Sequence, residues 1–182
     1  MLLLILGLLL WAGSHLMKRL TPGLRARLGD GPGRGMVALL SFLAIYLMFT
    51  GYRSADLIVV WSPPLFLRHI NNLLMLIAVI LFNMAQSRGV LPTVMRHPML
   101  TAVKIWAVAH LLVNGDLASI ILFGAMLAWA VAEVIVINRA TPAWLRPAKG
   151  PVVNDVIYVA LSLVLFGAIV WVHAWMGYPP LG

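Results

Sequence analysis

The sequence contains no cysteine and very few acidic residues. None of its 182 residues is Cys, and five Asp or Glu stand against thirteen Lys or Arg. The missing thiols exclude disulfides, iron–sulfur clusters, thiolate metal ligands and cysteine nucleophiles, which leaves His, Met and carboxylates as the available metal ligands. Charged residues make up only 10% of the chain and hydrophobic residues 63%, so a disordered chain is excluded and a water-soluble domain is disfavoured.

The basic residues give a formal charge of +8, a value that can indicate nucleic-acid binding. Here, however, the Lys and Arg residues lie between long apolar segments, which is the pattern of a membrane protein. We therefore expect the lipid bilayer, and not nucleic acid, as the partner of this chain. Its length is that of a single domain over residues 1–182.

Six apolar segments approach the roughly 20 helical residues that cross a hydrocarbon core about 30 Å thick. Because lipid satisfies no backbone hydrogen bonds, each segment is expected to be a helix. We predict an all-α fold, a polytopic membrane helix bundle of six transmembrane helices. The predicted spans are 1–17, 35–52, 69–87, 98–115, 117–138 and 156–182.

The first span could be mistaken for a signal peptide. It lacks a basic beginning and a small-residue cleavage site, so we interpret it as a retained helix. Glycine and proline residues then mark the connections between spans. Those between the first two spans are Gly29, Gly31, Pro32 and Gly33.

The basic residues are distributed unequally between the two sides of the predicted bundle. Only Arg53 and Arg68 fall on the side of the termini, so we expect both termini to be periplasmic and the other side to be cytoplasmic. Arg25 and Arg146 should then face the cytoplasm, while Ala55 and Gly182 should face outward. The ten bases of the predicted cytoplasmic side are Lys18, Arg19, Arg25, Arg27, Arg34, Arg88, Arg96, Arg139, Arg146 and Lys149.

Five histidines are the main candidates for a site, because polar groups at membrane depth cost free energy that ordinary packing does not require. His15 and His110 are embedded, His69 and His97 begin predicted helices, and His173 is interpreted as interfacial. His97 and His110 are 13 positions apart and about 140° out of register, so they cannot bind one metal together. Each embedded histidine could bind a metal or simply donate to a neighbouring carbonyl.

Lys104 and Glu133 are the charged residues within the predicted spans. We expect both to face the bundle interior, because a charge at the centre of a helix facing lipid costs about 2.5–3.5 kcal/mol. The side chain of Lys104 could extend to the cytoplasmic boundary or bind an anionic ligand, and the sequence does not decide between these two roles. Glu133 is expected to pair with Lys104 or Arg139.

Several motifs together resemble the NnrU family over nearly the whole chain. A His-Pro pair is followed on the same helix by Trp and then Ala-His, a combination that is unlikely by chance. The motifs are Gly13-Ser14-His15, Arg68-His69-Ile70-Asn71-Asn72-Leu73, Arg96-His97-Pro98, Lys104, Trp106, His110 and Asn114-Gly115-Asp116-Leu117.

This resemblance implies a haem-b protein of the bacterial inner membrane. NnrU proteins are integral membrane proteins associated with denitrification, and they share a domain with the plant 15-cis-zeta-carotene isomerase, a haem-b enzyme. By motif position His15 and His110 would be the iron ligands, with His97, His69 and Lys104 as further cofactor-binding residues. Ala107 stands where the isomerase has a cysteine, so exchange to a thiolate ligand is not available here.

The reaction stays open between three classes of function. A haem-dependent isomerase or redox enzyme would act on a lipophilic or small gaseous substrate. A membrane methyltransferase is the second class, because Arg96-His97-Pro98 also resembles a motif of the isoprenylcysteine methyltransferase families; Leu100 and Ala102 depart from that motif. A non-catalytic accessory factor for respiratory nitrogen-oxide enzymes is the third. The catalytic residues, protein partners and oligomeric state are not specified by the sequence.

The depths of the two embedded histidines differ. Counting about 1.5 Å per residue from the helix ends places His15 roughly 10 Å and His110 roughly 18 Å from the cytoplasmic boundary. A helix tilt of about 20° could absorb much of this difference. We predict that both bind one haem b.

Overall fold

A computed structural model describes residues 1–181, except for the side chains of Leu24 and Arg25. Residues 1–181 contain no strand, and the one isolated β-bridge joins Val59 to Asp116. The helices are α1 (Leu2–Leu20), α2 (Pro22–Arg27), α3 (Asp30–Arg53), α4 (Leu67–Met84), the short 3-10 helix η1 (Leu91–Thr93), α5 (Pro98–Val113), α6 (Leu117–Ala140) and α7 (Val152–Trp175).

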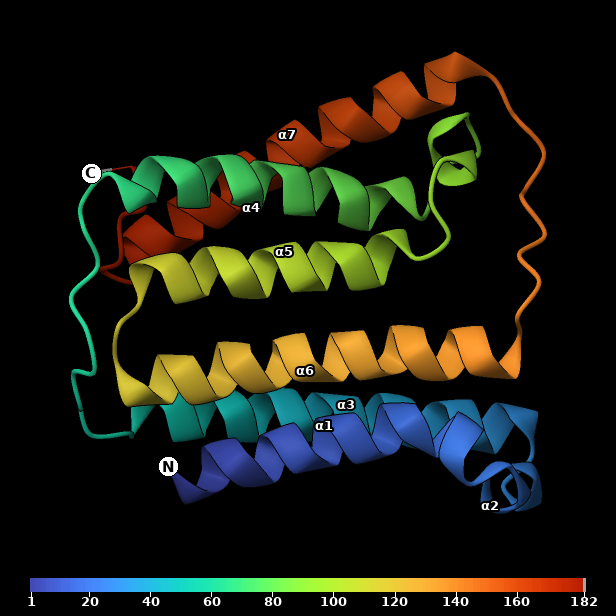
Figure 1. Cartoon of the computed structure of the whole chain (residues 1–182), viewed down its shortest axis with the longest axis horizontal. Coiled ribbons are helices and arrows are strands. Elements are labelled where there is room, and N and C mark those ends of the chain that lie inside the picture. Colours follow the sequence, from blue (N-terminus) through green and yellow to red (C-terminus); the bar gives the residue numbers. More distant parts are fainter. Residues whose placement is uncertain (182) are drawn as a thin grey trace.

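Five helices, namely α1, α3, α4, α6 and α7, are long and apolar enough to cross a membrane. The chain therefore has the architecture of a multi-pass membrane protein, and the all-α prediction is confirmed. Helix α5 has 16 residues and is about 24 Å long, shorter than a hydrocarbon core of about 30 Å. It nevertheless runs between α4 and α6, and the sixth span stays a prediction (Figure 1).

Successive long helices run in opposite directions (Figure 1). The connections 21–29, 85–97 and 141–151 lie at one end of the bundle, which we call the basic end. The ten bases of the predicted cytoplasmic side lie in or next to these three connections. The N-terminus and the connections 54–66 and 114–116 lie at the opposite end. Gly182, predicted to face outward, lies outside the described residues.

Helix α3 begins earlier than the predicted span 35–52. Gly31, Pro32 and Gly33, expected to break the chain, lie in the first turn of this helix. A proline is tolerated there because the first N–H groups of a helix have no intrahelical partner. Of the four residues expected to break the chain, Gly29 alone lies outside a helix, and its φ of 70° is a conformation that favours glycine.

Helix α7 begins earlier and ends earlier than the predicted span 156–182. Pro151 precedes its first residue, and Trp175 is its last. Gly177 then adopts a φ of 91°, which turns the chain away from the helix axis. The last described residues are therefore a terminal segment and not part of a span.

The core lies where α1, α3 and α6 meet. Leu4 of α1, Ala44 of α3 and Ala130 of α6 are fully buried in one hydrophobic cluster. Helix α6 also packs against α5, which packs against α4, and α7 covers α4 from outside. Helix α6 is thus the element that joins the α1–α3 pair to the α4–α5–α7 group, and both embedded histidines lie on its immediate neighbours.

Candidate functional site

His15 lies on α1 between two tryptophans. Its ring stacks on Trp11, one helical turn earlier, with centroids 4.1 Å apart. Trp129 of α6 packs edge-on against the same imidazole at 5.3 Å. His15 Nδ1 lies 2.8 Å from the Trp11 carbonyl oxygen, which can only accept, so Nδ1 carries the hydrogen. In the neutral ring Nε2 therefore has a free lone pair.

His110 repeats this arrangement on α5. Its Nδ1 donates to the carbonyl of Trp106, again four residues earlier, at 3.0 Å. Its ring stacks on Phe123 of α6 with centroids 4.4 Å apart. The bond to the carbonyl again leaves Nε2 as the nitrogen with the lone pair, the form in which neutral histidine binds metals.

Both imidazoles pack on α6, but at different levels. Trp129, which contacts His15, and Phe123, which contacts His110, are six residues apart, or about 9 Å along the helix axis. This offset is close to the depth difference predicted from the sequence. No ring contact joins His15 to His110 among the described residues, so their binding of one iron stays a prediction.

Three buried polar atoms near His15 have no hydrogen-bond partner among the residues described. They are the Nε1 atoms of Trp11 and Trp129 and Oε2 of Glu133. Trp129 is 9% exposed and Glu133 5% exposed, so neither exchanges freely with solvent. Buried groups of this kind cost free energy unless a water molecule or ligand supplies the missing bond.

Glu133 faces the bundle interior, as predicted, but its partner differs from the prediction. Its Oε2 lies 3.9 Å from the guanidinium of Arg19 on α1, and not beside Lys104 or Arg139. The α1–α6 contact brings Arg19 to this carboxylate, whereas Lys104 lies on α5 and is half-buried. Sequence spacing along one helix could not reveal a partner on another.

Arg96 and His97 join the beginning of α5 to the end of α6 at the basic end. Arg96 donates to the carbonyls of Thr141 and Pro142, and His97 Nε2 donates to Asn138 Oδ1 at 2.9 Å. These bonds satisfy acceptors at the C-terminus of α6, where a cation is also favoured by the helix dipole. Pro98 then begins α5, where its missing N–H costs nothing.

His69 is exposed in the first turn of α4, at the end of the bundle opposite to His97. It therefore lies far from His97, although both were predicted to support one cofactor. Its neighbour Asn71 is buried and donates to the carbonyl of Ala109 at 2.9 Å, next to His110. His173 of α7 bonds its own helix through Nδ1 and Ile169.

A cavity of about 190 Å³ lies between α3, α5 and α6 and is open on its outer side, where Phe49 is 53% exposed. One of its walls is Trp106, whose carbonyl holds His110. This volume is below the roughly 300 Å³ at which sites for drug-sized molecules begin. The cavity is lined by Ile45, Met48, Phe49, Tyr52, Trp106, Leu122 and Met126.

Sequence reasoning identified the two embedded histidines but missed the groups that orient them. The available signal was the spacing of Trp11 to His15 and of Trp106 to His110. Each tryptophan lies four positions before its histidine, which is about one helical turn, so its backbone carbonyl can accept a hydrogen bond from the imidazole. The role of Trp129 depends on helix packing and had no signal in the sequence.

The donor chemistry of both histidines fits an iron ligand. Each presents a lone pair on Nε2, is oriented by a carbonyl on Nδ1 and is packed against aromatic rings. The unpartnered indole N–H groups of Trp11 and Trp129 add donors that a carboxylate-bearing cofactor could use. These observations fit imidazole binding to a metal, and among the described residues no group of three or more His, Cys, Asp or Glu could hold a metal ion.

Fold and site together define a multi-pass helical membrane protein with two embedded histidines. Residues 3–180 match the family described as NnrU protein, and the chain belongs to the NnrU family over nearly its whole length. Comparison with curated proteins and with solved structures gave no match.

Proposed function

We propose that this NnrU-family protein binds haem b, with His15 and His110 as imidazole ligands. One observation carries the proposal. In both residues a hydrogen bond from Nδ1 to the carbonyl four positions earlier leaves Nε2 available to a metal, and an aromatic ring of α6 packs on the imidazole. The absence of cysteine leaves imidazole as the strongest available iron ligand.

The surrounding residues supply an apolar enclosure and a few polar contacts. Phe123 and Trp129 cover the imidazoles, and the indole N–H of Trp129 could donate to a carboxylate of the cofactor. When bound, haem would supply redox chemistry through its iron, and Lewis-acid chemistry only if one of the two imidazoles released the iron. Residues of α6 pack on both rings and hold them at different depths.

The cavity beside Trp106 is apolar and open on its outer side, so it could admit a small gas or one end of a lipophilic substrate. Membership of the NnrU family, which is associated with denitrification, leads us to propose nitrite and nitric oxide chemistry, with carotenoid-isomerase-like chemistry as the second candidate. An accessory factor that senses a gas could use the same cavity.

The methyltransferase alternative receives no support from the geometry. Arg96 and His97, which carry the resemblance to that class, both bond acceptors at the end of α6. Their polar atoms stabilise a helix junction in this structure. We further propose that the protein lies in the bacterial inner membrane, because the basic end matches the cytoplasmic side of such proteins.

Haem content of purified variants tests the proposal. His15→Ala and His110→Ala should each lower the haem-to-protein ratio or shift the Soret band, because each removes one iron ligand. If both ligands bind one iron, each variant should convert a six-coordinate spectrum to a five-coordinate one. An unchanged spectrum in both variants would refute the assignment.

His173→Ala is the matched control. His173 makes the same Nδ1 bond to the carbonyl four residues earlier, at 2.8 Å, but no aromatic ring among the described residues packs against its imidazole. Its replacement should leave haem content unchanged. A loss equal to that of His110→Ala would contradict the assignment of His15 as the second ligand, because His173 lies close enough to His110 to interact with it electrostatically and also carries its hydrogen on Nδ1.

A further inference from the structure

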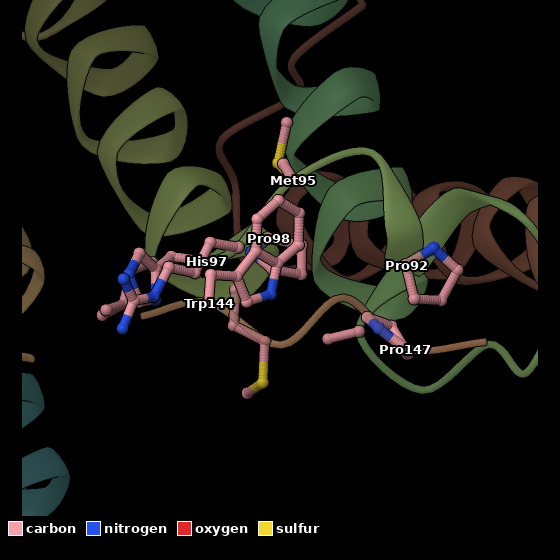
Figure 2. Close-up of a pocket in the computed structure, with 10 residues that line it drawn as sticks. Pro92, Met95, His97, Pro98, Trp144 and Pro147 are labelled. Atoms are coloured by element: carbon pink, nitrogen blue, oxygen red, sulfur yellow. The ribbon is translucent and has the colours of Figure 1, made fainter. Parts of the chain in front are cut away.

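A pocket of about 380 Å³ opens at the basic end, between the connections 85–97 and 141–151. Figure 2 shows Met95, His97, Pro98 and Trp144 grouped on one side of it, with Pro92 and Pro147 on the other. These residues lie at or beyond the helix ends, where a bilayer changes from hydrocarbon to headgroups. The volume lies within the range of small-molecule sites.

The walls of the pocket are mostly apolar, with Arg96 and His97 among the lining residues and Arg146 beside them. Trp144, with Met95 and Met99, provides polarizable apolar surface. The guanidinium of Arg146 lies over the Trp144 ring, 5.1 Å from its centroid. Arg96 lines the pocket, and its bonds to Thr141 and Pro142 use two of the five N–H donors of the guanidinium.

A pocket that combines apolar walls with arginines is suited to an amphipathic anion. A soluble anion would use the two arginines but not the methionines and the tryptophan, and a lipid without net charge would leave the positive charge of the arginines uncompensated. Arg88, Arg139 and Lys149 lie in or next to the same two connections and add positive charge to this end of the bundle. Basic pockets between helix ends at one membrane face are suited to anionic lipid headgroups.

We propose that this pocket binds an acidic phospholipid. The lipid phosphate accepts hydrogen bonds from Arg96 and Arg146, and the glycerol backbone and first acyl carbons pack on Trp144 and the methionines. The site is separate from the two embedded histidines and does not depend on haem binding. It assigns to Arg96 a ligand-binding role in addition to its bonds to the end of α6.

Native mass spectrometry of the detergent-purified full chain tests the proposal. Titration with dioleoyl phosphatidylglycerol should show one lipid that is retained more tightly than any further lipid. Dioleoyl phosphatidylcholine should bind at least tenfold more weakly, because its headgroup carries no net charge. Inorganic phosphate should not displace the bound lipid; displacement by phosphate at similar concentration would assign the site to a soluble anion and overturn the proposal.

Variants separate this pocket from the general positive charge of the basic end. Arg146→Gln and Trp144→Ala should each weaken the tight phosphatidylglycerol site about tenfold, which corresponds to about 1.4 kcal/mol. Arg146 is exposed, so its replacement should not disturb folding. The control is Arg27→Gln, an exposed arginine of α2 at the same end but outside the pocket, which should leave this site unchanged. Equal weakening in all three variants would show diffuse electrostatic attraction and would overturn the proposal.

Discussion

Single polar side chains inside the bundle determine how neighbouring helices are aligned. Asn71 is 8% exposed and reaches from α4 to a backbone carbonyl of α5. Tyr52 of α3 likewise bonds Ser119 of α6 at 2.8 Å, and Ser119 in turn donates to Asp116. In a bundle surrounded by lipid the loss of one such bond costs about 1 kcal/mol, because the polar groups also find other partners when the helices separate.

We expect Asn71→Ala to destabilise the protein by about 1 kcal/mol, the typical value of one interhelical hydrogen bond in a membrane protein. The bond from Asn71 to Ala109 would be lost inside the packed α4–α5 interface. Thermal unfolding in detergent measures this change. Asn72→Ala is the control, because Asn72 bonds only the terminal segment at Pro180 and should cost less. An equal or larger loss in the control would contradict this account.

A second prediction at this scale concerns the ion pair of Arg19 with Glu133. Arg19→Gln should destabilise the protein, because it leaves the buried Glu133 carboxylate without a positive neighbour. Adding Glu133→Gln should restore stability, since the uncompensated charge is then gone. A double-mutant cycle by thermal unfolding measures the coupling, with exposed Lys18→Gln as the control. Additive effects of the two changes would contradict the pairing.

At the scale of the elements, α1 and α3 approach each other closely through glycine. A Cβ placed on Gly7 would lie 2.7 Å from the Met48 backbone nitrogen, and one on Gly51 would lie 2.2 Å from the Leu4 nitrogen. Real side chains do not come this near to backbone atoms. The two glycines therefore allow the close helix packing that small residues give in membranes.

Gly7→Ala should separate α1 from α3 and destabilise the protein by about 1–3 kcal/mol, the usual cost of overpacking. Gly13→Ala, on the same helix, should be neutral or slightly stabilising, because nothing lies within 4 Å of its Cβ position and Ala favours helix. Thermal unfolding of both variants in detergent checks this difference. Equal melting temperatures for the two would contradict the packing described here.

The existence of the helices could be predicted from the sequence, but their ends and contacts could not. Long apolar segments must be helical in lipid, so every predicted span corresponds to a helix. The start of α3 was misplaced because Pro32 is compatible with a first helical turn, which composition does not reveal. The pairing of Arg19 with Glu133 depends on which helices are neighbours, and apolar faces directed at lipid carry no periodic signal for this.

The candidate site, too, could be predicted from the sequence only in part. The sequence identified His15 and His110 because polar residues at membrane depth are costly, and their difference in depth followed from residue counting. Their surroundings did not follow, because the contacts with Trp129 and Phe123 arise from the position of α6. The placement of His69 and His97 at opposite ends, by contrast, was already implied by the sequence, because the predicted topology puts the adjacent Arg68 and Arg96 on opposite sides.

At the scale of the whole molecule, the basic end should face the cytoplasm. The natural absence of cysteine allows single reporter thiols at exposed positions. In right-side-out membrane vesicles, Asp56→Cys should react with a membrane-impermeant maleimide, whereas Arg146→Cys should react only after permeabilisation. Positive residues are retained on the cytoplasmic side during insertion, which is the physical reason for this orientation. The reverse labelling pattern would contradict it.

The pyridine haemochrome spectrum of the purified wild-type chain is the most direct test of the central claim, because it identifies haem b without reference to any reaction. Protein prepared from haem-replete cells in mild detergent should give the absorption bands of haem b at about one haem per chain. The expected stoichiometry follows from two imidazole ligands sharing one iron. A chain that carries no haem after purification, and takes up none when hemin is added, would contradict the account.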